Sequence, residues 1–295
     1  MRDVRNRQQA LLAAAFFCTA ALAFSEPARV RNPAAQDLAS VKAKEAALRG
    51  RSAGPDDWKK LEADYAALVK KHPNDLPIRD AYGDYLWGMN DRAGAMREWL
   101  AAEKIDPNNA KILNHLGGTY LAMGEPHESL AYFIRARDAE PKNASTHFNV
   151  ANVACMFRHD LGKSEEECFK LALKEYAEAH RLAPGNSEFA RGYAETFYMV
   201  GNPDWQTALK VWRDYLNLMP EKNFALLNLA RVHLNLGEAD EARACLAQVT
   251  GAENDRLKSR LAARIDAELS QGKTPKPRET ENSQKPGIDE PPPPP

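Results

Sequence analysis

Five prolines stand at nearly regular intervals along this chain. They are Pro73, Pro107, Pro141, Pro184 and Pro220, and the gaps between them are 34, 34, 43 and 36 residues. Each proline follows a stretch with the apolar spacing of a helix, which it cannot continue because its ring removes a backbone donor. Self-similarity at such a period indicates repeated supersecondary units that pack on their neighbours. The chain is therefore expected to form a stack of helix pairs.

The unit from residue 110 to residue 143 shows the pattern most fully. Its first half predicts a helix with one apolar face, and Gly124 is the type of residue that ends such a helix. Gly117 lies on that face and, having no side chain, lets a second helix approach closely. The second half carries a matching stripe before Pro141. The first face holds Leu116, Gly117 and Tyr120, and the second holds Ser129, Phe133 and Ala136.

This order of small and aromatic residues, closed by a proline, resembles the tetratricopeptide repeat family. The resemblance implies an all-α fold, a right-handed superhelical solenoid of antiparallel helix pairs. Applied along the chain, it predicts a degenerate first repeat at 36–75, repeats at 76–109, 110–143, 144–186 (with an insertion) and 187–222, a repeat-like segment at 223–252, and a capping helix at 253–270.

The N-terminal segment has the features of a secretory signal. Three arginines precede an almost wholly apolar run, and Ala21-Leu22-Ala23 matches the small-x-small pattern of a cleavage site. We expect a signal peptide at 1–23, a linker at 24–35, and an exported protein of bacterial type, periplasmic or secreted. The alternative is an uncleaved segment that anchors the chain to the membrane, which is the only membrane contact expected.

The C-terminal segment, residues 271–295, is rich in Pro, Lys, Glu, Ser and Gln, and it ends in five prolines. It lacks periodic apolar residues, so we expect a disordered tail whose proline run favours the polyproline II conformation. Such a run is either a ligand for an aromatic groove or a solvated end.

Charge and motifs argue against several function classes. The formal net charge is −1, which gives no strong field for binding nucleic acid. No phosphate-binding loop, nucleophile elbow or zinc-protease motif occurs in the sequence, so we expect no enzyme activity, no catalytic residue and no cofactor. Of four possible metal ligands only three could converge, and no second ligand pair occurs, so no metal site is expected. The four are Cys155, His159, Cys168 and His180.

Cys155 and Cys168 lie almost symmetrically about the connection between two predicted helices. Antiparallel helices bring such residues level, so a disulfide between them is one expectation. The repeat pattern instead turns Cys155 toward the groove, which leaves two unpaired thiols as the alternative.

The family resemblance implies a concave groove lined by the first helix of each repeat. Residues that the packing pattern leaves free on those helices are the candidates for partner binding, and Arg191 and Tyr198 should be replaceable without loss of fold. Aromatic and arginine side chains are favoured at binding hot spots. The candidates are Trp87, Asn114, Leu121, Phe148, Asn152, Arg191, Glu195, Tyr198, Arg231 and Asn235.

These features together predict a non-catalytic scaffold that binds a peptide or protein partner in the groove, in envelope assembly or secretion. Two alternatives remain open. One is a structural adaptor that associates with copies of itself, and the other is an accessory subunit of an envelope enzyme.

Overall fold

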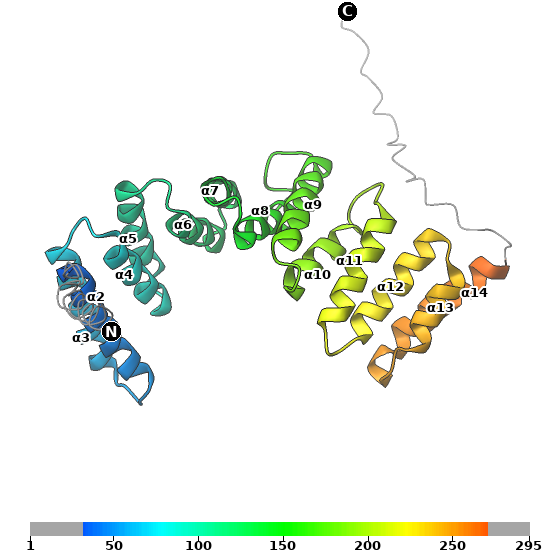
Figure 1. The fold of residues 1–295 in the computed structure, drawn as a ribbon, viewed down its shortest axis with the longest axis horizontal. Coiled ribbons are helices and arrows are strands. Elements are labelled where there is room, and N and C mark those ends of the chain that lie inside the picture. The colour runs from blue at the N-terminus through cyan, green and yellow to red at the C-terminus, as the bar shows by residue number, and fades with distance from the viewer. Residues whose placement is uncertain (1–31, 271–295) are drawn as a thin grey trace, which may run out of the picture. The chain divides into compact units, whose positions relative to one another are not determined.

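A computed structural model describes residues 32–270 of the chain, and the predicted signal peptide and proline-rich tail lie outside these residues. Within this range the regular secondary structure is entirely helical (Figure 1). No helix of the described range has the length and hydropathy needed to cross a membrane. The chain divides into two compact units, one ending at Met89 and the other beginning at Asn90.

The first unit contains α2 (Pro33–Arg49), α3 (Pro55–Lys71) and α4 (Leu76–Gly88). Helix α2 begins three residues earlier than the linker predicted at 24–35 would allow. The Asn32 side chain accepts hydrogen bonds from the amides of Ala34 and Ala35, and Pro33 occupies the first helical position, where proline is well tolerated. The last three residues of the expected linker are therefore helical.

The second unit is a stack of helices in which each helix packs against the next along the chain. Its members are α5 (Arg92–Ile105), α6 (Ala110–Ala122), α7 (Pro126–Ala139), α8 (Ala144–Met156), α9 (Glu165–Leu182), α10 (Ser187–Thr196), α11 (Trp205–Leu218), α12 (Asn223–Leu236), α13 (Ala239–Ala247), a 3-10 turn (Ala252–Asn254) and α14 (Asp255–Ser270). Helices α6, α8, α10 and α12 are the first helices of their repeats.

A short motif both ends one repeat and begins the next. Proline stops the second helix, and an asparagine two residues later caps the following first helix with its side-chain oxygen. This arrangement occurs at Asn109, Asn143 and Asn186, which accept hydrogen bonds from the amides of Ile112, Ser145 and Glu188. Pro107, Pro141 and Pro184 therefore each lie between the end of one helix and the capped start of the next.

Close packing of α6 against α7 depends on Gly117, which the helical spacing puts on the apolar face of α6. A Cβ atom added at Gly117 would lie 2.8 Å from ring carbons of Phe133, closer than side-chain carbons normally approach. Helices α6 and α7 therefore approach each other through a glycine against an aromatic ring, as the alternation of small and large residues predicted.

The insertion in the repeat at 144–186 lengthens one helix and the connection before it. Helix α8 has 13 residues, as α6 does, whereas α9 has 18 residues against 14 in α7. Helix α9 begins directly after Ser164, whose hydroxyl accepts from the Glu167 amide at 3.2 Å while a Glu167 carboxylate oxygen accepts from the Ser164 amide at 2.9 Å. This capping box sets the start of the longer helix.

The expected disulfide between Cys155 and Cys168 is wrong, because both thiols are free in the structure. They pack in different clusters of the core. The Cys155 sulfur lies 3.5 Å from the sulfur of Met199 in the next repeat, and the Cys168 sulfur faces the backbone oxygen of Arg158 at 3.7 Å. Cys155 and Cys168 are nearly equidistant from the connection between α8 and α9, but the repeat pattern turns Cys155 away from α9, and this orientation decides what the thiol contacts.

Candidate recognition face

Two arginine–aromatic pairs join the first helices of neighbouring repeats in the second unit. The guanidinium carbon of Arg191 on α10 lies 4.9 Å from the ring centroid of Phe224 on α12. The guanidinium carbon of Arg231 on α12 lies 4.0 Å from the ring centroid of Tyr198, directly after α10. A cation over an aromatic face at such distances is attracted by the ring quadrupole. In the first pair the arginine lies on α10 and the ring on α12, whereas in the second pair the arginine lies on α12 and the ring follows α10.

The spacing of these residues explains how one sequence pattern produces both pairs. Each pair joins residues 33 positions apart, close to one repeat period, and the two pairs are seven residues apart on each element. Seven residues make about two helical turns, so Phe224 and Arg231 lie on the same side of α12, while Tyr198 lies in the turn that follows α10. We call Arg191, Glu195, Tyr198, Phe224 and Arg231 the α10–α12 seam.

Asn228 holds one end of the seam. Its backbone oxygen accepts a hydrogen bond from the Tyr198 hydroxyl at 3.0 Å, and its side-chain oxygen accepts from Nη1 of Arg231 at 3.0 Å. Burial raises the pKa of Tyr198 well above its ordinary value, which keeps the hydroxyl protonated as a donor. Tyr198 and Arg231 are thus positioned by each other and by one asparagine.

The other end of the seam is more open. Nε of Arg191 donates to a Glu195 carboxylate oxygen at 2.9 Å, one turn along α10, and this hydrogen bond raises the pKa of Arg191. Phe224 has 41% of its surface exposed, although its ring also contacts Trp212 and Tyr215. This end presents a positive group, a carboxylate and an aromatic ring to the outside.

The remaining candidates lie at separate places in the structure. Asn114 accepts a hydrogen bond from Asn149 of the next first helix at 3.2 Å. Asn152 accepts one from the Tyr176 hydroxyl at 2.6 Å. Leu121 packs against the core cluster that contains Phe133, and Asn235 is half-buried near the end of α12. Only the four candidates of the seam are brought together in one group.

The packing pattern left the aromatic candidates free on the groove-lining helices, whereas the structure shows all three half-buried. Phe148 is half-buried with its ring centroid 4.7 Å from that of Phe189, and Tyr198 is half-buried against Trp205 and the main cluster of its repeat. Trp87 is half-buried on α4 in the first unit. Large rings on a first helix bury part of their surface against the neighbouring repeat, because that contact removes apolar area from water.

Sequence reasoning missed Phe224 and Asn228. Phe224 follows Arg191 by nearly one repeat period, so the periodic spacing that identified Arg231 was also available for Phe224. The role of Asn228 depends on a backbone oxygen and on the direction of one side chain, which no spacing reveals.

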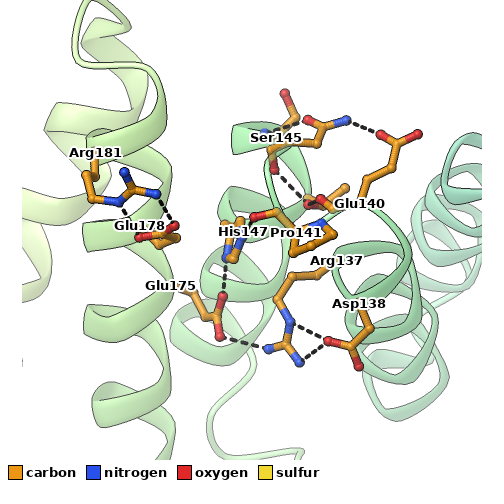
Figure 2. Close-up of polar contacts among 11 residues, drawn as sticks. Arg137, Asp138, Glu140, Pro141, Ser145, His147, Glu175, Glu178 and Arg181 are labelled. Carbon is orange, nitrogen blue, oxygen red and sulfur yellow. Dashed lines mark hydrogen bonds and ion pairs between the residues drawn. The ribbon is translucent and has the colours of Figure 1, made fainter.

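A buried ionic cluster lies elsewhere in the stack, among α7, α8 and α9 (Figure 2). Glu175, only 2% exposed, accepts from Nη1 of Arg137 at 2.7 Å and faces Nδ1 of His147 at 2.6 Å. Nε2 of His147 faces the backbone oxygen of Pro141 at 3.0 Å. Both carboxylate oxygens of Glu175 have partners within the protein. The cluster therefore connects three helices.

Comparison with known proteins agrees with the fold of stacked helix pairs. Residues 110–138 and residues 225–256 each match a tetratricopeptide repeat model. The chain carries tetratricopeptide repeats. No curated protein matches its sequence.

Solved structures match the fold over most of the chain. The YrrB structure, described as a TPR protein with an unusual peptide-binding site, is 15% identical, covers 70% of this chain and 97% of its own, and has a TM-score of 0.53. The pilF protein of Pseudomonas aeruginosa is 15% identical, covers 80% and 97%, and scores 0.54. PilW, described as a type IV pilus biogenesis factor, is 19% identical, covers 72% and 91%, and scores 0.51. At these identities the match confirms the expected fold class, an all-α solenoid of helix pairs.

Proposed function

We propose that this chain is a non-catalytic interaction scaffold and that it binds a protein or peptide partner at the α10–α12 seam. The fold itself supports the general part, since tetratricopeptide repeats are generally interaction modules without catalytic activity. The observation that carries the location is the exposed Phe224 ring beneath the Arg191 guanidinium. Arginine and aromatic residues supply most of the energy at protein interfaces.

The seam also indicates which chemistry a partner should offer. A guanidinium group has five N–H donors and matches the geometry of a carboxylate. Arg191 uses its Nε toward Glu195, and Arg231 uses its Nη1 toward Asn228, so each group keeps further donors. A segment with a carboxylate beside an apolar side chain would satisfy the guanidinium groups and cover the Phe224 ring.

We further propose that the scaffold is exported and works in envelope assembly or secretion. The N-terminal arginines, the apolar run after them and Ala21-Leu22-Ala23 support export. A shared fold with PilW, which is described as a pilus biogenesis factor, is compatible with this setting. Mass spectrometry of the protein from its native host should find a new terminus near Phe24. An intact Met1 in the envelope fraction would contradict cleavage.

Partner binding can be tested by affinity capture from an envelope extract of the host, with the full chain as bait. Arg191→Ala should reduce the captured partner by about tenfold, the effect of losing a moderate interface hot spot. Arg181→Ala is the matched control, because Arg181 is also an exposed arginine paired with an acid on its own helix, Glu178 on α9. Equal capture by the two variants would contradict binding at the seam.

A further inference from the structure

We propose that the chain's own acidic proline segment, residues 288–295, binds the α10–α12 seam and competes with the partner. The segment reads Ile-Asp-Glu followed by five prolines, and it lies outside the residues that the structure describes. This inference rests on the proposed function, because it assigns an internal competitor to the same site.

The first argument is reach. Helix α14 ends at Ser270 and packs directly on α12 and α13. Seventeen residues, 271–287, separate Ser270 from the segment, and a chain of that length spans up to about 60 Å. Helix α12, which carries Phe224 and Arg231, has 14 residues and is only about 21 Å long. Because α14 contacts α12 itself, every part of the seam on α12 lies well within this reach.

The second argument is apolar complementarity. A polyproline II segment presents a preformed ridge of rings and loses little conformational entropy on binding, and proteins recognise such segments with exposed aromatic side chains. The open end of the seam provides an aromatic ring of this kind in Phe224, 41% exposed on the same helix that α14 covers. The proline run is therefore matched by an aromatic surface within its own chain.

The third argument is charge. Asp289 and Glu290 directly precede the prolines. The seam has two cationic groups, Arg191 and Arg231, against the single carboxylate of Glu195. Two acids next to a polyproline run therefore match two guanidinium groups next to an aromatic ring. The acidic half of the segment thus matches the two arginines, and the proline half matches the Phe224 ring, within the same seam.

Photo-crosslinking in the full chain tests the contact. With Phe224 replaced by the photoreactive residue benzoylphenylalanine, illumination should link position 224 to residues 288–295 of the same chain, at monomer mass. The control places the same photoreactive residue at Leu257, which is also 41% exposed and lies on α14, nearer in sequence to the tail. It should give little of this product. Equal yields at both positions would show undirected encounters and overturn the proposal, as would linkage only between two chains.

A charge variant of the full chain tests the chemistry. Asp289→Asn with Glu290→Gln should lower the crosslink yield at position 224 about fivefold, as expected for losing two exposed ion pairs. Glu279→Gln with Glu281→Gln makes the same change of charge elsewhere in the tail and should leave the yield unchanged. A yield insensitive to the first pair overturns the proposal. The experiment contains no partner, so a missing crosslink alongside Arg191-dependent capture would reject the competitor and leave the proposed function standing.

Discussion

The Arg231 guanidinium carbon lies 4.0 Å from the centroid of the Tyr198 ring, although the two residues belong to different repeats. Asn228 contacts both side chains, through its backbone oxygen and its amide oxygen. An arginine on α12 and an aromatic ring in the turn after α10 thus form a contact that holds neighbouring repeats together and also lies beside the proposed binding surface.

Removing the cation from this contact should weaken the stack. Arg231→Ala should lower the free energy of unfolding by about 1–2 kcal/mol, because it deletes a partly desolvated cation–π contact and a hydrogen bond to Asn228. Urea denaturation followed by circular dichroism measures the change. Arg213→Ala, at an exposed position on α11, is the control and should change stability by less than about 0.5 kcal/mol. Equal effects of the two substitutions would contradict the role of the contact.

Two adjacent glycines provide a matched test of helix packing. Gly117→Ala places a methyl group 2.8 Å from the Phe133 ring and should destabilise the protein by about 1–3 kcal/mol. Gly118→Ala meets no atom within 4 Å and should stabilise α6 by about 0.5–1 kcal/mol, since alanine favours the helix. Thermal melting of the two variants should therefore shift in opposite directions. A Gly117→Ala protein that melts with the parent would show that α6 and α7 do not meet at this residue.

The start of α11 should contribute to the loss of stability in acid. Hydrogen bonds from the Thr207 side chain and backbone lower the pKa of Asp204 below its ordinary 3.8. Because its pKa is lower in the folded state, Asp204 stabilises the fold above pH 3.8, and this contribution is lost as the pH falls through the folded pKa. Asp204→Asn keeps a capping side chain without the charge and should flatten the fall in melting temperature below about pH 4. An unchanged acid slope would contradict this assignment.

The buried cluster in Figure 2 should be sensitive to the loss of one charge. Glu175→Gln removes the buried carboxylate that Arg137 and His147 share and should cost about 3 kcal/mol of folding free energy, because a charge pair is broken at a buried site and Arg137 keeps only Asp138 as a counter-charge. Glu178→Gln, one turn along α9 in a more exposed pair with Arg181, should cost less than about 1 kcal/mol. Denaturant unfolding of both variants measures the difference, and similar costs would contradict a structural role for the cluster.

The sequence predicted the parts of the fold that depend on local chemistry and period. Regular prolines located the ends of helices, and Gly117 located a close helix contact, because each depends on backbone constraints of a single residue type. The candidate site was predicted less well. Spacing identified which residues share the face of α10 and α12, but it treated Tyr198 as freely replaceable. The structure shows Tyr198 as a half-buried contact between repeats, because its exposure depends on how far the next repeat extends over it, a property that period alone does not contain. The disulfide failed for the same reason, since helix orientation rather than sequence symmetry decides what Cys155 meets.

The most direct test of the central claim is arginine-selective chemical modification of the scaffold with and without its captured partner. The Asp289→Asn, Glu290→Gln chain is suited to this test, since its own tail should not mask the seam. Mass spectrometry of the modified peptides reports each arginine separately. Bound partner should slow modification of Arg191 and Arg231 and leave Arg181 on α9 and Arg213 on α11 unchanged. Protection of Arg181 and Arg213, with Arg191 and Arg231 as reactive as in the free protein, would contradict recognition at the α10–α12 seam.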